Sequence, residues 1–213
     1  ERTKVYSSLS YTRDQGLLKN ENQDRYVLRL NVDHELLKWL KAGLTSNLSY
    51  SDRNNGVNNT FTRSLSAFPL GNAYDENGNI IHEYAQNEYS PLGDFIPNQY
   101  DNNNKNTYLN VNGNVEILPF DGLSLKSVIS GMLNNGRVGQ FWGNQANANR
   151  PSYAGSPHAS ITNNYSRSYT WENILSYNNT FAEKHTIGAT LVTSWSKSQN
   201  EFNMASTSGQ QLE

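Results

Sequence analysis

The sequence predicts an all-β protein, an antiparallel up-and-down meander of about seven strands. Three observations lead to this expectation. Nearly every ordered-looking segment has a hydrophobic period of two, and almost none has the helical period of 3.6. One face of each segment avoids charge, whereas the other accepts it. The connections also alternate strictly in length, as they do when successive turns of a meander lie at opposite ends.

The first three expected strands cover residues 5–11, 26–32 and 40–50. Apolar side chains occupy alternate positions, and strand side chains point alternately to opposite faces. Arg29, Asp33 and Lys41 all fall on the other face, so each run predicts one apolar and one polar side. The apolar positions are Val5, Leu9, Tyr11, Tyr26, Leu28, Leu30, Val32, Leu40, Ala42, Leu44, Leu48 and Tyr50.

The last four expected strands cover residues 109–117, 123–130, 169–178 and 186–195. Their polar face is rich in Asn, Ser, Thr and Gly rather than in the Lys and Glu of an ordinary solvated sheet, which favours a water-filled lumen. It includes Asn110, Asn112, Asn114, Glu116, Lys126 and Glu172. The apolar positions are Leu109, Val111, Val115, Ile117, Leu123, Leu125, Ile129, Tyr169, Trp171, Leu175, Tyr177, Ile187, Ala189, Leu191 and Trp195.

The connections favour a membrane barrel. Tight links at 33–39, 118–122 and 181–185 alternate with longer ones, and the two longest cover about residues 53–105 and 141–167. Short turns at one end and long loops at the other are typical of a segment of a large transmembrane β-barrel. Aromatic residues near the run ends suit an interfacial girdle; they are Trp39, Tyr50, Trp171 and Trp195. A soluble sandwich or jelly roll shows the same alternation and stays open as the alternative.

The amino-acid composition limits the kind of core and the kind of partner that this protein can have. Only 35% of the 213 residues are hydrophobic and mean hydropathy is -0.76, so a thick core covered on both sides is not expected. The net charge of -2 argues against a nucleic-acid partner. The chain has no cysteine and no run of about 18 apolar residues. It starts abruptly at Glu1 with no leader, and we expect it to be an excised segment of a longer protein.

We find no signal for catalysis, a metal or a cofactor. The histidines are scattered without metal-site spacing; they are His34, His82, His158 and His185. The segment 74–79 has an incomplete calcium-loop pattern, because Gly78 is the fourth position from Asp75 rather than the sixth. A type I′ turn at Asn77 and Gly78 is the simpler interpretation.

Four segments closely resemble, in order, barrel segments of the SusC/RagA group of TonB-dependent outer-membrane transporters of Bacteroidetes. They are "YSSLSYTRDQGLLKNENQDRYVLRLNVDHELLKWLKAGLTSNLSYSD", "PLGNAYDENGNII", "VEILPFDGLSLKSVISG" and "WENILSYNNTFAEKHTIGATL". The most specific parts are "RYVLRLNVD", "PLGNAYDENGN" and "LPFDGLSLKS". The resemblance implies a 22-stranded barrel in the bacterial outer membrane, of which this chain would be about a third, with neither plug nor signal peptide.

The resemblance also implies partners and a substrate class. A SusD-like lipoprotein would cover the barrel, TonB would pull on the plug, and the usual substrates would be oligosaccharides, or peptides for some members. The different class that stays open is a soluble all-β carbohydrate-binding or adhesive module.

The two long loops hold the candidate contact residues for a ligand or a lid protein. Aromatic side chains stack on sugar faces and pack at interfaces. The candidates are Tyr84, Tyr89, Trp142 and Tyr153. The alternative is that the loop aromatics form a small core of the loops themselves, over the barrel rim.

Overall fold

The computed structural model describes residues 2–57, 60–67, 69–85, 88–146, 156–182 and 184–209, with the backbone alone at residues 84, 85 and 88. Its long strands are β1 (Thr3–Gln15), β2 (Asn22–Leu37), β3 (Leu40–Asn54), β6 (Tyr100–Phe120), β7 (Leu123–Trp142), β8 (His158–Phe181) and β9 (His185–Ser208). Its short elements are α1 (Thr60–Leu65), β4 (Glu83–Ala85), β5 (Glu88–Tyr89) and the 3-10 helix η1 (Gly93–Phe95). Among these residues, no helix has the length and apolar character needed to cross a membrane.

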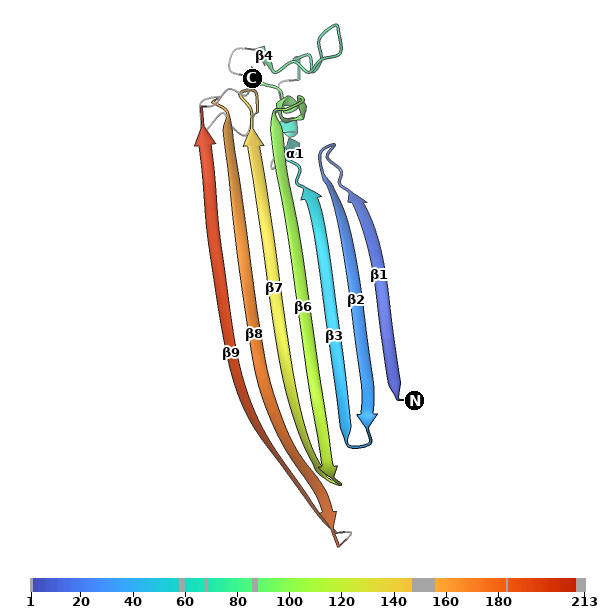
Figure 1. Ribbon diagram of the computed structural model, residues 1–213. Helices are drawn as coiled ribbons and strands as arrows, with labels where there is room; N and C mark the ends of the chain where they lie inside the picture. Colours follow the sequence, from blue (N-terminus) through green and yellow to red (C-terminus); the bar gives the residue numbers. More distant parts are fainter. Residues whose placement is uncertain are drawn as a thin grey trace.

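The seven long strands form a single antiparallel sheet in the order β1-β2-β3-β6-β7-β8-β9. Each strand pairs with the long strands that precede and follow it in the chain, and no connection crosses over. Figure 1 shows the strands side by side as a gently curved ribbon. The predicted meander of about seven strands is therefore confirmed.

The turns and loops separate to opposite ends of the sheet (Figure 1). The tight turns are Lys38–Trp39, Asp121–Gly122 and residues 182–184, and the longer connections are residues 16–21, 55–99 and 143–157. Gly122 has a φ of +89°, and a Cβ there would lie 2.6 Å from the Asn178 carbonyl oxygen. Glycine is therefore required in that turn.

The strands extend further toward the loop end than hydrophobic alternation predicts. β6 begins at Tyr100 and β8 at His158, so residues 100–105 and 158–167 belong to the sheet rather than to loops. Both faces are polar at this end of β6, as at the successive residues Asn103 and Asn104, and in β8 the apolar residues, such as Ile161, are too few to alternate regularly. Backbone pairing continues there without a regular apolar alternation, which is why the sequence period does not reveal these strand ends.

The sheet has no core of its own. The buried hydrophobic residues within the described ranges are Val57 and Ala146, and both lie in connections. The strands expose large apolar side chains instead, with Leu9 78% exposed and Ile129 62% exposed. A soluble sandwich would cover this face with a second sheet. In the described part of the chain, the other sheet is only the two-stranded β4-β5 pair.

The strand register gathers the apolar side chains into rows across one face. Leu9, Leu28, Leu48, Leu109 and Leu133 pair in succession from β1 to β7. The neighbouring row toward the loop end is aromatic on β1 to β3. There the ring centroids of Tyr11 and Tyr26 lie 4.9 Å apart, and those of Tyr26 and Tyr50 lie 6.4 Å apart. Leucines bordered by tyrosines are typical of a lipid-facing surface and its interfacial girdle.

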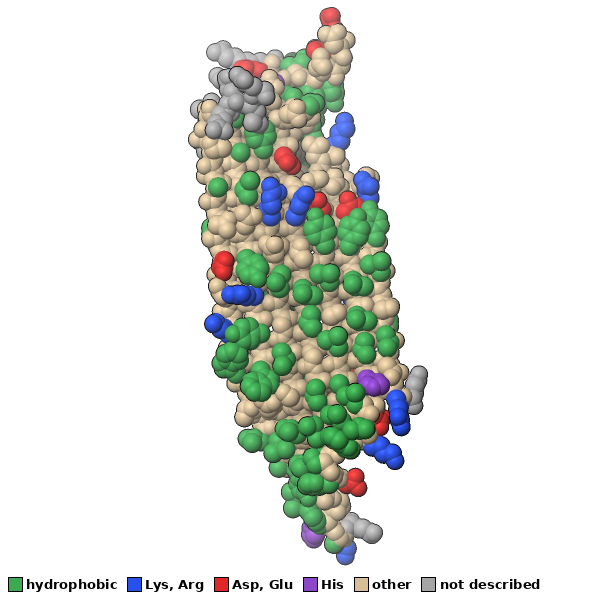
Figure 2. Space-filling model, in the orientation of Figure 1, with side chains coloured by type: hydrophobic (Ala, Val, Ile, Leu, Met, Phe, Trp, Pro, Cys, Tyr) green, Lys and Arg blue, Asp and Glu red, His purple; other side chains and the backbone are tan. Residues whose placement is uncertain are grey.

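A row of charged residues bounds this apolar face just beyond the tyrosines (Figure 2). Successive pairing joins Arg13, Asp24, Asp52, Lys105 and Arg137. Ion pairs link the first two, with 3.9 Å between Nε and Oδ1, and the third and fourth, with 3.3 Å between Nζ and Oδ2. The sequence runs avoid charge on this face as predicted, and the longer strands add charge only at its edge.

The charge-free band has the height of a membrane span. On the apolar face it runs from Leu40 to Tyr50 in β3 and from Thr107 to Ile117 in β6. A tilted strand crosses the bilayer in about 9–11 residues. On β8 the boundary lies nearer the turns, because Arg167 pairs with Leu133 of β7. The boundary thus crosses the sheet diagonally, as the tilt of barrel strands produces.

Candidate functional site: the loop layer and the polar wall

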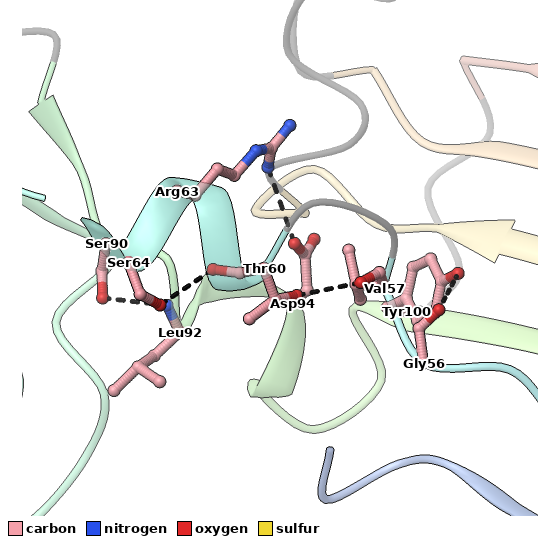
Figure 3. Close-up of polar contacts among 9 residues, drawn as sticks. All are labelled: Gly56, Val57, Thr60, Arg63, Ser64, Ser90, Leu92, Asp94 and Tyr100. Atoms are coloured by element: carbon pink, nitrogen blue, oxygen red, sulfur yellow. Dashed lines mark hydrogen bonds and ion pairs between the residues drawn. The ribbon is translucent and has the colours of Figure 1, made fainter. Parts of the chain in front are cut away.

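The connection between β3 and β6 folds into a small unit above the sheet. In Figure 3, α1 lies beside the segment that leads to β6. The Thr60 hydroxyl donates to the Val57 carbonyl at 3.1 Å, and the Ser64 hydroxyl donates to the Thr60 carbonyl at 2.8 Å. A helix of six residues is too short to be stable alone, so α1 depends on its contacts with the rest of the loop.

A buried ion pair joins the two ends of this unit (Figure 3). Arg63 Nη1 in α1 lies 3.7 Å from Asp94 Oδ2 in η1, and the Asp94 side chain is only 1% exposed. Ser90 is equally buried, and its hydroxyl accepts the Leu92 N–H at 3.2 Å. A buried charge needs such a partner to offset its lost hydration, so the pair fixes α1 against the η1 segment.

The unit turns several apolar side chains outward. Phe61 and Leu65 stand four residues apart on α1 and are 75% and 74% exposed. Leu70 is 83% exposed and Tyr74 is 55% exposed. The aromatics Phe61 and Tyr74 thus lie outside the loop's small polar core. The sequence placed Phe61 among the loop aromatics but did not pair it with Leu65, because a single helical turn is too short to show a helical period.

The predicted contact residues do not form one cluster. Tyr89 is half-buried and its ring centroid lies 5.3 Å from that of His82. Trp142 is half-buried and stacks on His158, with ring centroids 5.2 Å apart. The side chain of Tyr84 and the whole of Tyr153 lie outside the described residues. The roles of all four in contacting a ligand or lid remain a prediction.

Residues 74–80 form a hairpin closed by a bridge between Tyr74 and Ile80. The predicted type I′ turn is wrong, because that turn needs a positive φ at Asn77 as well as at Gly78, and only Gly78 has one, at +81°. The Asp75 carboxylate explains the difference. It accepts the backbone N–H groups of Asn77 at 2.9 Å and Asn79 at 2.7 Å.

The hydrogen bonds to Asp75 also lower the pKa of its carboxyl below the usual 3.8, with the Asn79 side-chain amide as the largest cause. The Asp75 carboxylate is therefore engaged by hydrogen bonds from amides within the turn. Within the described residues, no three His, Cys, Asp or Glu side chains gather closely enough to hold a metal ion.

The face opposite the leucines is a polar wall, as the alternation predicts. Asn47 of β3 pairs with Asn110 of β6, and the Asn112 side-chain amide donates to Asn110 Oδ1 at 2.9 Å. Nearer the turns, Glu116 pairs with Lys41 on one side and Lys126 on the other. Amides offer donors and acceptors without fixed charge, so this wall can exchange hydrogen bonds with a polar solute along its length.

Comparison with known proteins finds a TonB-dependent receptor and solved peptide transporters that are similar to the chain. It is 26% identical over 204 residues to TonB-dependent receptor P26 of Formosa agariphila, across 95% of this chain and 20% of that protein. The solved structure of the RagAB peptide transporter matches with a TM-score of 0.77 and 21% identity, over 98% of this chain and 24% of that one. The structure of the RagAB peptide importer in its closed-closed state matches with a TM-score of 0.78, at the same identity and coverage.

No protein-family model matches the chain. The chain spans about a fifth of the length of the curated relative and about a quarter of the RagAB chains. The resemblance to SusC/RagA transporters is confirmed over nearly the whole chain. Its seven-stranded meander is a barrel segment with the fold of a TonB-dependent transporter.

Proposed function

We propose that this chain forms part of the wall and the outer loops of an outer-membrane transporter that imports nutrients with energy delivered through TonB. The observation that carries this proposal is the pair of unlike faces on one sheet. Leucines such as Leu48 and Leu109 lie on a bare apolar face bounded by charges, and amides such as Asn110 and Asn112 lie on the other. Such a sheet suits lipid on one side and a water-filled lumen on the other.

The long connections mark the extracellular end of the sheet, because barrel loops are longer outside the cell than on the periplasmic side. Residues 55–99 and 143–157 would therefore meet incoming substrate. Energy coupling would come from a plug region elsewhere in the full-length protein. The chain itself would supply barrel wall and loops and no enzymatic step.

The loop layer is suited to a lid protein. Phe61, Leu65, Leu70 and Tyr74, here together called the α1 patch, are four exposed apolar side chains within one loop segment at the loop end of the sheet. Exposed apolar side chains gathered in one segment favour a protein contact. We assign the α1 patch to a SusD-like surface lipoprotein, the partner that the family resemblance implies, with Tyr84, Tyr89, Trp142 and Tyr153 as further candidates for lid or ligand contact.

The substrate class is an oligosaccharide or a peptide. The solved relatives are described as a peptide transporter and importer, whereas the sequence resemblance favours oligosaccharides. The polar wall suits both, because hydroxyl and amide groups alike bond to asparagine side chains.

Uptake by cells tests the proposal. Deleting the gene of the full-length protein should abolish uptake of one fluorescent pool, either oligosaccharides or oligopeptides, and deleting tonB should have the same effect. The lipoprotein should co-purify with the full-length protein in detergent. Uptake of both pools at the wild-type rate in the gene deletion would contradict the import function.

A further inference from the structure

The polar wall contains a hollow of about 350 Å³ at the height of the tyrosine and charged rows that mark the edge of the apolar face. Strands β2, β3, β6, β7 and β8 all contribute to its lining. Four of the lining residues are asparagines, namely Asn104, Asn106, Asn134 and Asn164. The hollow thus lies on the lumen side of the sheet, between the membrane band and the loop layer.

Gly136 makes the hollow possible. It stands between Asn106 of β6 and Asn164 of β8 in the register of the sheet. A Cβ at this position would lie 3.4 Å from Asn106 Oδ1 and 4.0 Å from the Asn164 carbonyl oxygen. Any larger side chain would therefore occupy the space that the flanking asparagines surround.

One hydrogen-bond acceptor in the lining of the hollow has no partner. Asn134 Oδ1 is buried and has no hydrogen-bond partner in the described structure, and Asn134 belongs to the lining. Buried polar atoms are normally satisfied, and an unsatisfied one costs free energy. A bound molecule that donates an N–H or O–H group would satisfy this oxygen.

The β2 and β3 side of the hollow is cationic. Arg53 lies in the lining, with its Nη2 3.7 Å from Glu21 Oε1. Arg25 pairs with Ser51, another lining residue, and therefore lies beside the hollow on the same face. No ion pair to Arg25 is formed within the described ranges. A guanidinium holds a carboxylate through paired N–H donors.

We propose that this hollow is a substrate contact site in the barrel wall, and that it takes a carboxylate-bearing group with neighbouring N–H or O–H donors. The proposal rests on the import function proposed above and specifies its substrate. Arg25 and Arg53 bind the carboxylate, Asn134 accepts a hydrogen bond, and the other asparagines bond to neighbouring hydroxyl or amide groups. Acidic side chains of a peptide and uronate sugars of an oligosaccharide share this chemistry.

The test uses the purified full-length protein with its lipoprotein, and measures the Kd of fluorescent probes. Tetraglutamate and trigalacturonate are the acidic probes, and tetraglutamine and maltotriose are their neutral counterparts. One acidic probe should bind at least tenfold more tightly than its neutral counterpart. Tight binding of tetraglutamate would identify the carboxylate as that of a peptide, and tight binding of trigalacturonate would identify it as that of a uronate sugar. Binding of neither acidic probe would overturn the proposal.

Gly136→Leu, which fills the hollow, should weaken binding of that acidic probe at least tenfold. The matched control is Gly131→Leu on the same strand, because Gly131 faces the opposite side and a Cβ there meets open space. This control should bind as the wild type does. Equal Kd values for wild type and Gly136→Leu would overturn the proposal, as would equal weakening by the two variants.

Arg25→Gln provides an independent variant, because Arg25 is exposed and takes part in none of the ion pairs formed within the described residues. It should weaken the acidic probe about tenfold and leave the neutral probe unchanged. An unchanged acidic Kd would count against the site even if Gly136→Leu failed to assemble. In cells, TonB-dependent uptake that continues unchanged in both variants would refute the substrate contact site alone. Absence of such uptake by the wild type would refute the import function itself.

Discussion

The sheet and the loop layer of this protein are stabilised in opposite ways. The seven strands expose apolar side chains such as Leu9 and Ile129 and bury none of them. The connection between β3 and β6 buries the polar residues Thr60, Ser90 and Asp94 together with the apolar Val57. The sheet thus depends on its backbone pairing and on the medium around it. The loop layer depends on its own hydrogen bonds and on one buried ion pair, so the two regions should respond to different perturbations.

The largest effect should come from a charge placed on the apolar face. Val111→Lys puts an ammonium near the middle of the charge-free band of β6, and should destabilise the folded full-length protein by about 2–4 kcal/mol in lipid. Asn112→Lys, one residue along the same strand, points to the polar wall and should cost less than about 1 kcal/mol. Urea unfolding in phospholipid vesicles measures both. Equal losses would mean that the two faces do not meet different media.

A smaller effect, confined to the loop layer, should follow from Asp94→Ala. This change removes the buried carboxylate that pairs with Arg63, and should destabilise the loop unit by about 1–3 kcal/mol. Hydrogen exchange of the α1 amides should accelerate while exchange in the strands stays unchanged. Glu76→Ala, at an exposed turn position, is the control and should leave both rates as they are. Faster exchange in the strands would show that the loop layer supports the sheet.

The α1 patch should affect the partner rather than stability. Replacing both Phe61 and Leu65 with Ser removes two exposed apolar side chains, and should weaken binding of the lipoprotein about tenfold, or roughly 1.4 kcal/mol. The melting temperature of the full-length protein should not change. Surface plasmon resonance between the two purified proteins gives the Kd. Wild-type affinity in the double variant would remove the α1 patch from the lid contact.

The smallest effect should be a pH response of the hairpin at residues 74–80. Because folding lowers the pKa of Asp75 below 3.8, its carboxylate contributes stability that is complete above that pH. The contribution fades as the pH falls through the lower folded pKa. Exchange of the Asn77 and Asn79 amides, corrected for intrinsic rates, should therefore accelerate below about pH 4, and Asp75→Asn should abolish the pH step. A step of equal size in Asp75→Asn would assign it to another group.

Sequence alone predicts the strands of the charge-free band well. Between Leu109 and Ile117, apolar and polar residues alternate, so the number of strands and their facing follow from the period, and the order of the strands follows from the alternating lengths of the connections. Beyond the band, as at Asn103 and Asn104, both faces are polar and the signal is lost although the backbone pairing continues.

The candidate sites are less predictable for a related reason. The hollow at Gly136 depends on the register of five strands at once, which no local pattern encodes. The exposure of Phe61 and Leu65 depends on a six-residue helix held by Thr60, Ser64 and the pair of Arg63 with Asp94. The loop aromatics were recognisable as a group, but their individual partners, such as His82 for Tyr89, arise only from the folded loop.

The most direct measurement is the facing of neighbouring residues in the membrane. This chain has no cysteine, so single cysteines at positions 44, 45, 111 and 112 of the full-length protein can each carry a fluorophore, after removal of any other cysteine. Leu44 and Val111 lie on the apolar face, and Thr45 and Asn112 lie on the polar wall. Brominated lipid should quench the labels at 44 and 111, and an aqueous quencher in the lumen should reach those at 45 and 112. If brominated lipid quenches none of the four, this sheet does not face a membrane, and the soluble all-β module becomes the better description.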